Sequence, residues 1–264
     1  MIDALPAPLD VKLMNMAASV LLVACVLVAL AAGAWWVLRH PAFAIGRIVV
    51  QGELVHNNAV TLRANVAPQL VGNFFTIDLS AARSAFEQVP WVRSAQVRRQ
   101  YPRTLRVVLQ EHHAAAHWGP ESGNDMVNDY GEVFEANGGD AEQDDLPRLS
   151  GPEGEAARVL QMYGLLQPVF EPLDMAIEAL ELSGRGGWHV ALEGGAVVEL
   201  GGGTSEEVVQ RTQRFARTLT QVAAQHQRRA DALESADLRH SGGYAVRLRG
   251  VTTVAPDALK IGRN

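Results

Sequence analysis

Residues 16–38 read MAASVLLVACVLVALAAGAWWVL and contain no charged side chain. At a rise of about 1.5 Å per residue, a helix of this length spans the roughly 30 Å hydrocarbon core of a membrane. Trp35 and Trp36 end the run, where amphipathic rings favour the headgroup level, and Arg39 and His40 follow them. The sequence therefore predicts one transmembrane helix over residues 16–38, with all that follows on one side of a membrane.

A cleavable signal peptide is the alternative to this anchor, because residues 31–34 read AAGA and offer small side chains to a peptidase. The apolar region of a signal peptide is usually about 7–15 residues, and this run is longer. The length favours an uncleaved anchor. The positive-inside rule does not give the orientation of this helix in the membrane, because positive residues lie on both sides of it: Lys12 before the run, and Arg39 and Arg47 after it.

The 264-residue chain is long enough to form one large or two small domains after the helix. The net charge differs between the two halves of the chain: residues 43–113 carry a net charge of +4, and the residues from Glu121 onward carry a net charge of −10. This split predicts two domains with different partners. The sole cysteine, Cys25, lies in the apolar run, so the rest of the chain holds no disulfide and no thiol ligand.

The region after the anchor has the pattern β-α-α-β-β. A β-branched run at residues 44–52 predicts a strand. One helix is predicted from Ala59 to before Pro68, and a second begins at Asp78 or Ser80 and is ended by Pro90. Residues 91–99 and 104–111 then predict a hairpin.

The second half predicts a mixture of strands and helices. Thr204 and Glu207 form a capping box at the start of one helix. The other predicted elements are a hairpin at 126–134, an acidic loop at 140–145, a helix at 155–166, and strands at 176–183, 188–192, 196–200, 232–239 and 244–249.

Residues 74–118, FFTIDLSAARSAFEQVPWVRSAQVRRQYPRTLRVVLQEHHAAAHW, resemble the POTRA domain of the bacterial cell-division family FtsQ. Residues 146–152, LPRLSGP, are similar to a step in the second domain of that family. The resemblance implies an α+β chain with a cytoplasmic tail (1–15), a transmembrane helix (16–38), a POTRA domain (43–113), a β domain (114–250) and a C-terminal tail (251–264).

The resemblance also implies a function without catalysis and without a cofactor. FtsQ proteins are divisome scaffolds that link early and late division proteins and bind the FtsB–FtsL complex through the β domain. Other divisome proteins are expected on the POTRA domain and the membrane helix. The implied location is the inner membrane at the division septum, with the N-terminus cytoplasmic, the following domains periplasmic and no nucleic acid bound.

Local alignment with the family implies eleven partner-binding positions: Arg185, Phe215, Asp237, His240, Gly242, Gly243, Tyr244, Ala245, Val246, Arg247 and Leu248. His240 stands where the family has a tyrosine, and Leu248 where some members have a tryptophan. We expect residues 244–249 to form an edge strand that accepts a partner strand by β-augmentation. Proline at Ala245 or Arg247 is then expected to remove a hydrogen bond to the partner.

The sequence gives little support for a metal site, a phosphate-binding loop or a catalytic carboxylate pair. Neighbouring histidines on a strand, such as His112 and His113, point to opposite faces, which disfavours a metal site with His117. Gly201–Thr204 lacks the lysine of a phosphate loop. Asp144 and Asp145 lack the apolar surroundings that carboxylate catalysis requires.

The arginines at 93, 98, 99, 103 and 106 form a basic hairpin. Nucleic acid is one possible ligand, but anionic lipid or a protein partner fits a domain outside the cytoplasm better. Two rival functions remain open: a POTRA-bearing envelope assembly or secretion component, which would carry POTRA repeats or a barrel, and a membrane-anchored cell-wall hydrolase, which would need an acid/base or nucleophile constellation.

Overall fold

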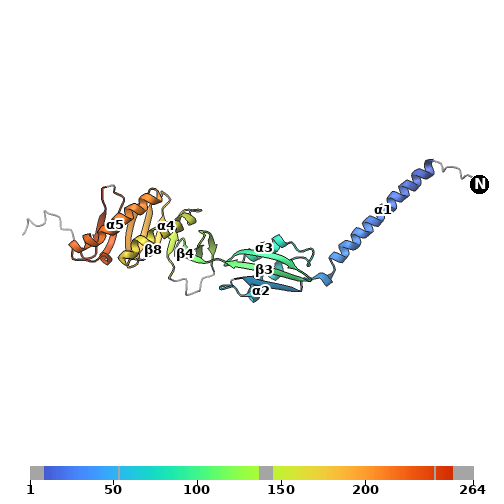
Figure 1. Ribbon diagram of the computed structural model, residues 1–264, viewed down its shortest axis with the longest axis horizontal. Coiled ribbons are helices and arrows are strands. Elements are labelled where there is room, and N and C mark those ends of the chain that lie inside the picture. The colour runs from blue at the N-terminus through green and yellow to red at the C-terminus, as the bar shows by residue number, and fades with distance from the viewer. Residues whose placement is uncertain (1–8, 53, 137–144, 241, 252–264) are drawn as a thin grey trace, which may run out of the picture. The chain divides into compact units, whose positions relative to one another are not determined.

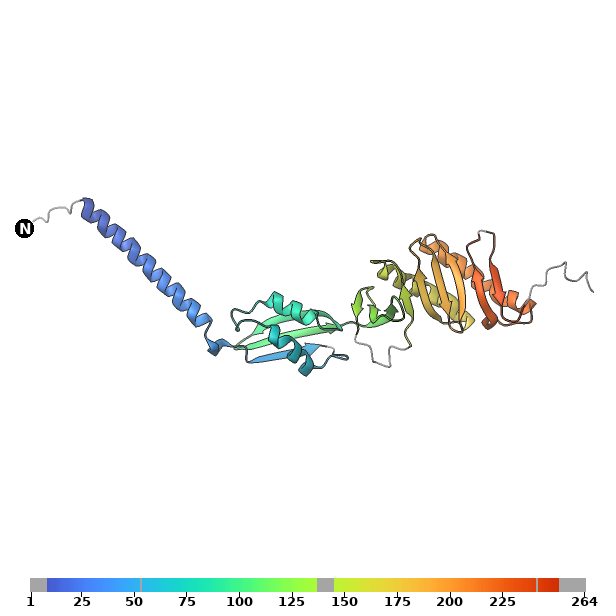
Figure 2. The same ribbon diagram turned by 180° about the vertical axis from the view of Figure 1, so that it is seen from behind.

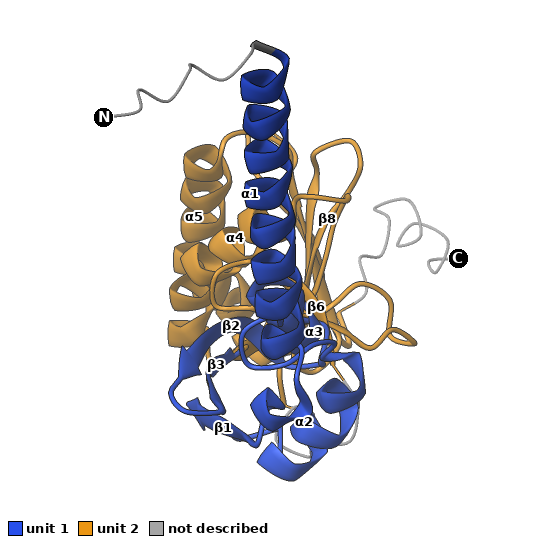
Figure 3. Cartoon of the chain, turned by 90° about the vertical axis from the view of Figure 1, so that its right-hand side faces the viewer, with its two compact units in different colours: residues 1–111 blue, residues 112–264 orange. Residues whose placement is uncertain are grey.

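The computed structural model describes residues 9–52, 54–136, 145–240 and 242–251 (Figure 1). The chain divides into unit 1, residues 1–111, and unit 2, residues 112–264 (Figure 3). Of the predicted acidic loop at 140–145, only Asp145 is among the described residues. Of the predicted C-terminal tail at 251–264, only Val251 is. The fold is the predicted combination of an apolar helix with two α+β modules.

The first helix, α1, runs from Leu9 to Leu38. It is the one helix among the described residues that is long and apolar enough to cross a membrane, and none of it is buried. Helix α1 begins inside the predicted tail of residues 1–15, because Leu9–Asn15 are helical. The apolar run sets where a membrane is crossed and not where the helix begins, because polar residues such as Lys12 are good helix formers.

The remainder of unit 1 forms the predicted β-α-α-β-β module. Asn58 and Asp78 cap the starts of its two helices: the Asn58 side chain accepts a hydrogen bond from the N–H of Val60, and the Asp78 side chain accepts from the N–H groups of Ser80 and Ala81. The elements are η1 (Pro41–Phe43), β1 (Arg47–Gly52), α2 (Ala59–Val66), η2 (Ala67–Gln69), α3 (Leu79–Glu87), β2 (Val92–Gln100) and β3 (Thr104–Glu111). The sheet order is β1-β3-β2, with β1 parallel and β2 antiparallel to β3.

One face of this sheet carries the core of unit 1. Val107 and Leu109 of β3 pack with Phe86 of α3 and Leu62 of α2, and all four side chains are at most 3% exposed. Because side chains alternate along a strand, the opposite face presents the intervening residues, which are mostly Arg, Gln, Ser and Thr.

Glu111, the last residue of β3, is a buried carboxylate that holds the loop before α2. Its oxygens accept hydrogen bonds from the backbone N–H groups of Val55 (2.8 Å), His56 (3.0 Å) and Asn57 (3.0 Å). Burial acts to raise the pKa of Glu111, but the hydrogen bonds from the His56 backbone and from Asn57 and Val55 outweigh it and lower the pKa. The charged form is therefore the one that the fold stabilises.

Glu111→Gln should loosen this loop, because an amide offers one acceptor oxygen to three donors. We expect a loss of about 1–3 kcal/mol of local stability, seen as faster amide exchange at residues 54–58. A lowered folded-state pKa stabilises the fold above the unfolded pKa, and this contribution is lost as the pH falls through the folded value. Acidification should thus lower the protection factors of these amides, which are corrected for the intrinsic exchange rate at each pH, in the wild type and change them little further in Glu111→Gln. Equal exchange in both proteins at neutral pH would contradict this role.

Unit 2 contains a nine-stranded mixed sheet in the order β12-β11-β10-β9-β8-β7-β4-β5-β6 (Figure 2). Its strands are β4 (Ala114–Trp118), β5 (Asp125–Asn128), β6 (Val133–Glu135), β7 (Arg148–Ser150), β8 (Ile177–Leu182), β9 (Trp188–Leu192), β10 (Ala196–Gly201), β11 (Leu233–Asp237) and β12 (Ala245–Leu248). The helices are α4 (Ala156–Phe170), η4 (Glu171–Leu173), α5 (Ser205–Gln225) and η5 (Ala230–Ala232).

Two helices cover one side of this sheet (Figure 3). Helix α4 connects the parallel neighbours β7 and β8, and α5 connects the parallel neighbours β10 and β11. Parallel neighbours need such a crossover connection, and both crossovers place their helix on the same face. The predicted capping box at Thr204 and Glu207 is present and begins α5. Strand β12 is thereby left as one edge of the sheet.

Candidate functional site

Among the described residues, strand β12 pairs only with β11, so the described sheet ends in an open edge. The pairing is antiparallel, with Ala245 opposite Asp237, Val246 opposite Ala236, and Arg247 opposite Ser235. The edge strand predicted over residues 244–249 is therefore present as residues 245–248.

The hydrogen bonds around β11 and β12 fix which backbone groups point outward. The N–H of Arg249 donates to Ala232 of η5, which runs directly into β11, so residue 249 faces β11. On the other side of β11, the N–H of Leu238 donates to Glu199 of β10, which turns Asp237 toward β12. In-plane direction alternates along a strand. Ala245 and Arg247 thus bond to β11, and the N–H and C=O groups of Val246 face the open edge.

This register corrects the expected proline positions. Proline at Ala245 or Arg247 would interrupt the ladder between β11 and β12 within the protein itself. The N–H groups that face the open edge belong to the alternate residues Tyr244, Val246 and Leu248.

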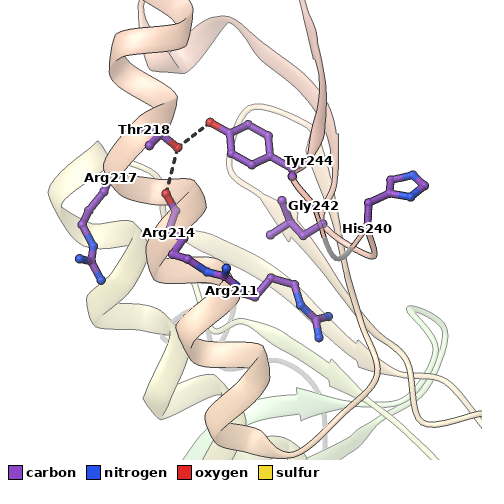
Figure 4. Close-up of a pocket in the computed structure, with 9 residues that line it drawn as sticks. Arg211, Arg214, Arg217, Thr218, His240, Gly242 and Tyr244 are labelled. Carbon is purple, nitrogen blue, oxygen red and sulfur yellow. Dashed lines mark hydrogen bonds between the residues drawn. The ribbon is translucent and has the colours of Figure 1, made fainter.

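The side chain of Tyr244 fastens the start of β12 to helix α5 (Figure 4). Its ring packs edge-on against Phe215, with ring centroids 5.1 Å apart. Its hydroxyl lies 2.6 Å from Oγ1 of Thr218, which is also 2.9 Å from the carbonyl oxygen of Arg214. Since the single hydroxyl proton of Thr218 is directed to that carbonyl, Tyr244 donates to Thr218.

A groove of about 380 Å³ lies between α5 and the segment before β12, and we call it the Tyr244 groove. It is lined by Arg211, Arg214, Arg217, Thr218, Leu238, His240, Gly242, Gly243 and Tyr244. No carboxylate lines it, and Arg214 and Arg217 form no ion pair within the described residues. Arg211 is different, because its guanidinium donates to the carbonyl oxygens of Leu200 and Gly202. The groove is therefore cationic beside an apolar wall.

Six of the predicted partner-binding residues lie either in the lining of the groove or in the core beneath it. His240, Gly242, Gly243 and Tyr244 line the groove. Phe215 is 0% exposed and Leu248 is 5% exposed. These two side chains lie in the core and support the surface instead of presenting themselves at it.

The other predicted positions do not line the groove. Arg185 is exposed in the β8–β9 turn and does not line it. Hydrogen bonds from the Arg239 side chain, at 2.7 and 2.9 Å, hold the pKa of Asp237 well below its usual range. Arg247 lies 3.5 Å from Glu234 across the strand pair.

The arginine row of α5 was not among the predicted site residues. Arg211, Arg214 and Arg217 are spaced by three residues, which groups side chains on one side of a helix. This spacing is the signal that identifies the row in the sequence. The ring of His112 has a structural contact, because it stacks on Phe134 with centroids 4.1 Å apart. The described residues contain no group of three side chains that could hold a metal ion.

Comparison with known proteins covers both modules. Residues 43–112 match the family described as "POTRA domain, FtsQ-type", and residues 116–239 match "Cell division protein FtsQ/DivIB, C-terminal". A cell division protein FtsQ from Burkholderia pseudomallei is 41% identical over 243 residues, covering 92% of this chain and 94% of the relative. The chain belongs to the FtsQ family. Further FtsQ proteins, from Thiomonas arsenitoxydans (covering 92% of this chain and 89% of the relative) and Bordetella pertussis (90% and 92%), are each 37% identical.

Membership in the FtsQ family gives the chain a role in the cell-division machinery. Together with α1, it indicates a single-pass membrane protein. In this FtsQ family member, the open edge and the Tyr244 groove are the features of unit 2 that are suited to protein–protein interaction.

Proposed function

We propose that the chain is a divisome scaffold that binds the FtsB–FtsL complex by adding a partner strand to β12, without catalysis. The observation that carries the proposal is the open edge, where the N–H and C=O groups of Val246 face outward. Such groups need partners, and β-augmentation supplies them. The POTRA domain and the membrane helix would contact other division proteins.

The Tyr244 groove supports a particular chemistry for the added strand. Within the described residues, Arg214 and Arg217 offer positive charge without an ion pair, and the half-buried Tyr244 offers apolar surface beside it, above the buried Leu238. A segment that carries an acidic residue next to an apolar or aromatic one would fit both features. His240 and Leu248 in place of family aromatics leave Tyr244 as the aromatic anchor on this side.

The direct test is co-purification from membranes in mild detergent. The full chain should retain FtsB and FtsL, whereas a chain ending at residue 111 should lose both. Retention by the shortened chain would place the contact in unit 1 or α1 and would contradict the proposal.

We also propose the orientation and the boundaries of the parts. Residues 1–15 are cytoplasmic, residues 16–38 cross the inner membrane, and residues 43–113 and 114–250 form the periplasmic POTRA and β domains, followed by a tail at 251–264. The protein would concentrate at the septum. Alkaline phosphatase, which is active only after export, should be active when fused after Asn264. A fusion that is well expressed but inactive would contradict the proposed orientation.

A further inference from the structure

The uncovered face of the sheet in unit 1 is basic and lacks carboxylates. Helices α2 and α3 pack on the other face, through residues such as Phe86 and Leu62. The side chains of the uncovered face are Arg47, Val49 and Gln51 of β1, Ser94, Gln96, Arg98 and Gln100 of β2, and Thr104, Arg106, Val108 and Gln110 of β3. Its charges are therefore all positive.

The arginines on this face are grouped, and no described residue forms an ion pair with them. Arg98 lies directly opposite Arg106, and Arg47 is two residues along the neighbouring strand. Like charges directly opposite each other destabilise a sheet. Arg106 and Arg98 bond only to the neutral Gln51 (2.9 Å) and Gln96 (3.3 Å), and the described residues give none of the three an ion pair.

The group lies at the end of the module where the chain enters it from the membrane helix. The N–H groups of Gly46 and Arg47 lie 2.9 and 3.4 Å from the carbonyl oxygen of Arg103, so the β2–β3 turn is beside the start of β1. Only residues 39–46 separate α1 from β1, a span of at most about 30 Å. The same turn carries Tyr101, which is 84% exposed.

We infer that this face, defined by Arg47, Arg98 and Arg106, docks on anionic phospholipid headgroups of the membrane that α1 crosses. Positive charge matches the phosphate groups, and the short connection keeps the face within reach of them. An exposed tyrosine beside arginines is also the composition of a membrane–water interface. The inference concerns unit 1 and does not depend on the partner proposed for β12.

The test places a fluorescent label on this face in the full chain, reconstituted in nanodiscs. Cys25→Ala removes the sole cysteine, and Gln100→Cys then provides one labelling position on the uncovered face. The discs contain phosphatidylcholine with or without phosphatidylglycerol, and each includes a lipid whose headgroup quenches the label. Quenching should be strong with phosphatidylglycerol, weak without it, and reduced by salt.

The variant Arg47→Gln/Arg98→Gln/Arg106→Gln should remove the phosphatidylglycerol-dependent quenching. Each arginine near an anionic surface contributes about 1 kcal/mol, which is about fivefold in the ratio of docked to free domain. Loss of all three should therefore lower this ratio by about a hundredfold. The charge-matched control Arg63→Gln/Arg158→Gln/Arg229→Gln should keep it. A second control, the label at Val60→Cys on α2, which is 69% exposed, should stay unquenched.

Two results would overturn the inference. One is equal quenching with and without phosphatidylglycerol, and the other is unchanged quenching in the triple variant of the face. If the label is instead shielded only when solubilised division proteins are added, the occupant is a protein and the lipid assignment is wrong.

Discussion

Replacing Val246 by proline is expected to weaken binding of the FtsB–FtsL complex by at least about tenfold and to leave unit 2 folded. Proline has no N–H, and the N–H of Val246 faces the open edge, so the lost hydrogen bond is one to the partner. A missing bond costs roughly 0.5–1.5 kcal/mol net, and the proline ring adds a clash with the added strand. About 1.4 kcal/mol corresponds to a factor of ten in the dissociation constant.

Two further variants of β12 separate the loss of the outward N–H from the loss of side-chain packing and from the disruption of the sheet. Val246→Ala keeps the N–H and shortens only the half-buried side chain, so it should bind more tightly than the proline variant. Ala245→Pro removes a bond to Asp237 of β11, so it should detach β12 and expose its amides to exchange even without the partner. Wild-type affinity in a folded Val246→Pro protein would rule out strand addition at this edge.

Phe215→Ala should have the largest effect on stability of any single change at the site. The ring is 0% exposed and lies among the side chains of the unit 2 core. Truncating a buried phenylalanine typically costs about 3–5 kcal/mol, part of it from the cavity that remains. The change also removes the surface against which Tyr244 packs, so the Tyr244 groove should lose its shape along with the core.

The measurement is the amide exchange rate of β9 and β10, which reports the opening of unit 2 separately from unit 1. Phe215→Leu fills most of the same space and should show a clearly smaller increase in exchange. Tyr244→Phe removes only the hydrogen bond to Thr218 and should leave these strands protected, while loosening the start of β12. Unchanged protection of β9 and β10 in Phe215→Ala would contradict the placement of this ring in the core.

Sequence patterns predicted most elements because their signals are local. The hairpin of β2 and β3 shows alternation over eight or nine residues, and Thr204 with Glu207 marks the start of α5 directly. Two strands were missed for physical reasons. Strand β4 is rich in alanine, which has a low strand propensity, and β7 has only three residues. Their places in the sheet come from long-range pairing.

The candidate site was predicted less completely than the fold. Alternation identified the apolar face of residues 244–248, which carries Val246 and Leu248 of β12 and Tyr244 just before it. The direction in which each N–H of β12 points within the plane of the sheet depends on how β11 pairs with β10 and with β12. The register shift between Leu233 and Ser235 also affects this direction. The contact of Tyr244 with α5 likewise joins residues 26 positions apart or more. Such information is not present in a local pattern.

Residue-resolved hydrogen exchange of β12, with and without the FtsB–FtsL complex, tests strand addition most directly. Before binding, the amides of Ala245 and Arg247 should already be protected by β11, and those of Tyr244 and Val246 should exchange quickly. Adding the complex should slow exchange at Tyr244 and Val246 and change Ala245 and Arg247 little. If the complex binds and the Val246 amide still exchanges at its free rate, the partner does not add a strand to this edge.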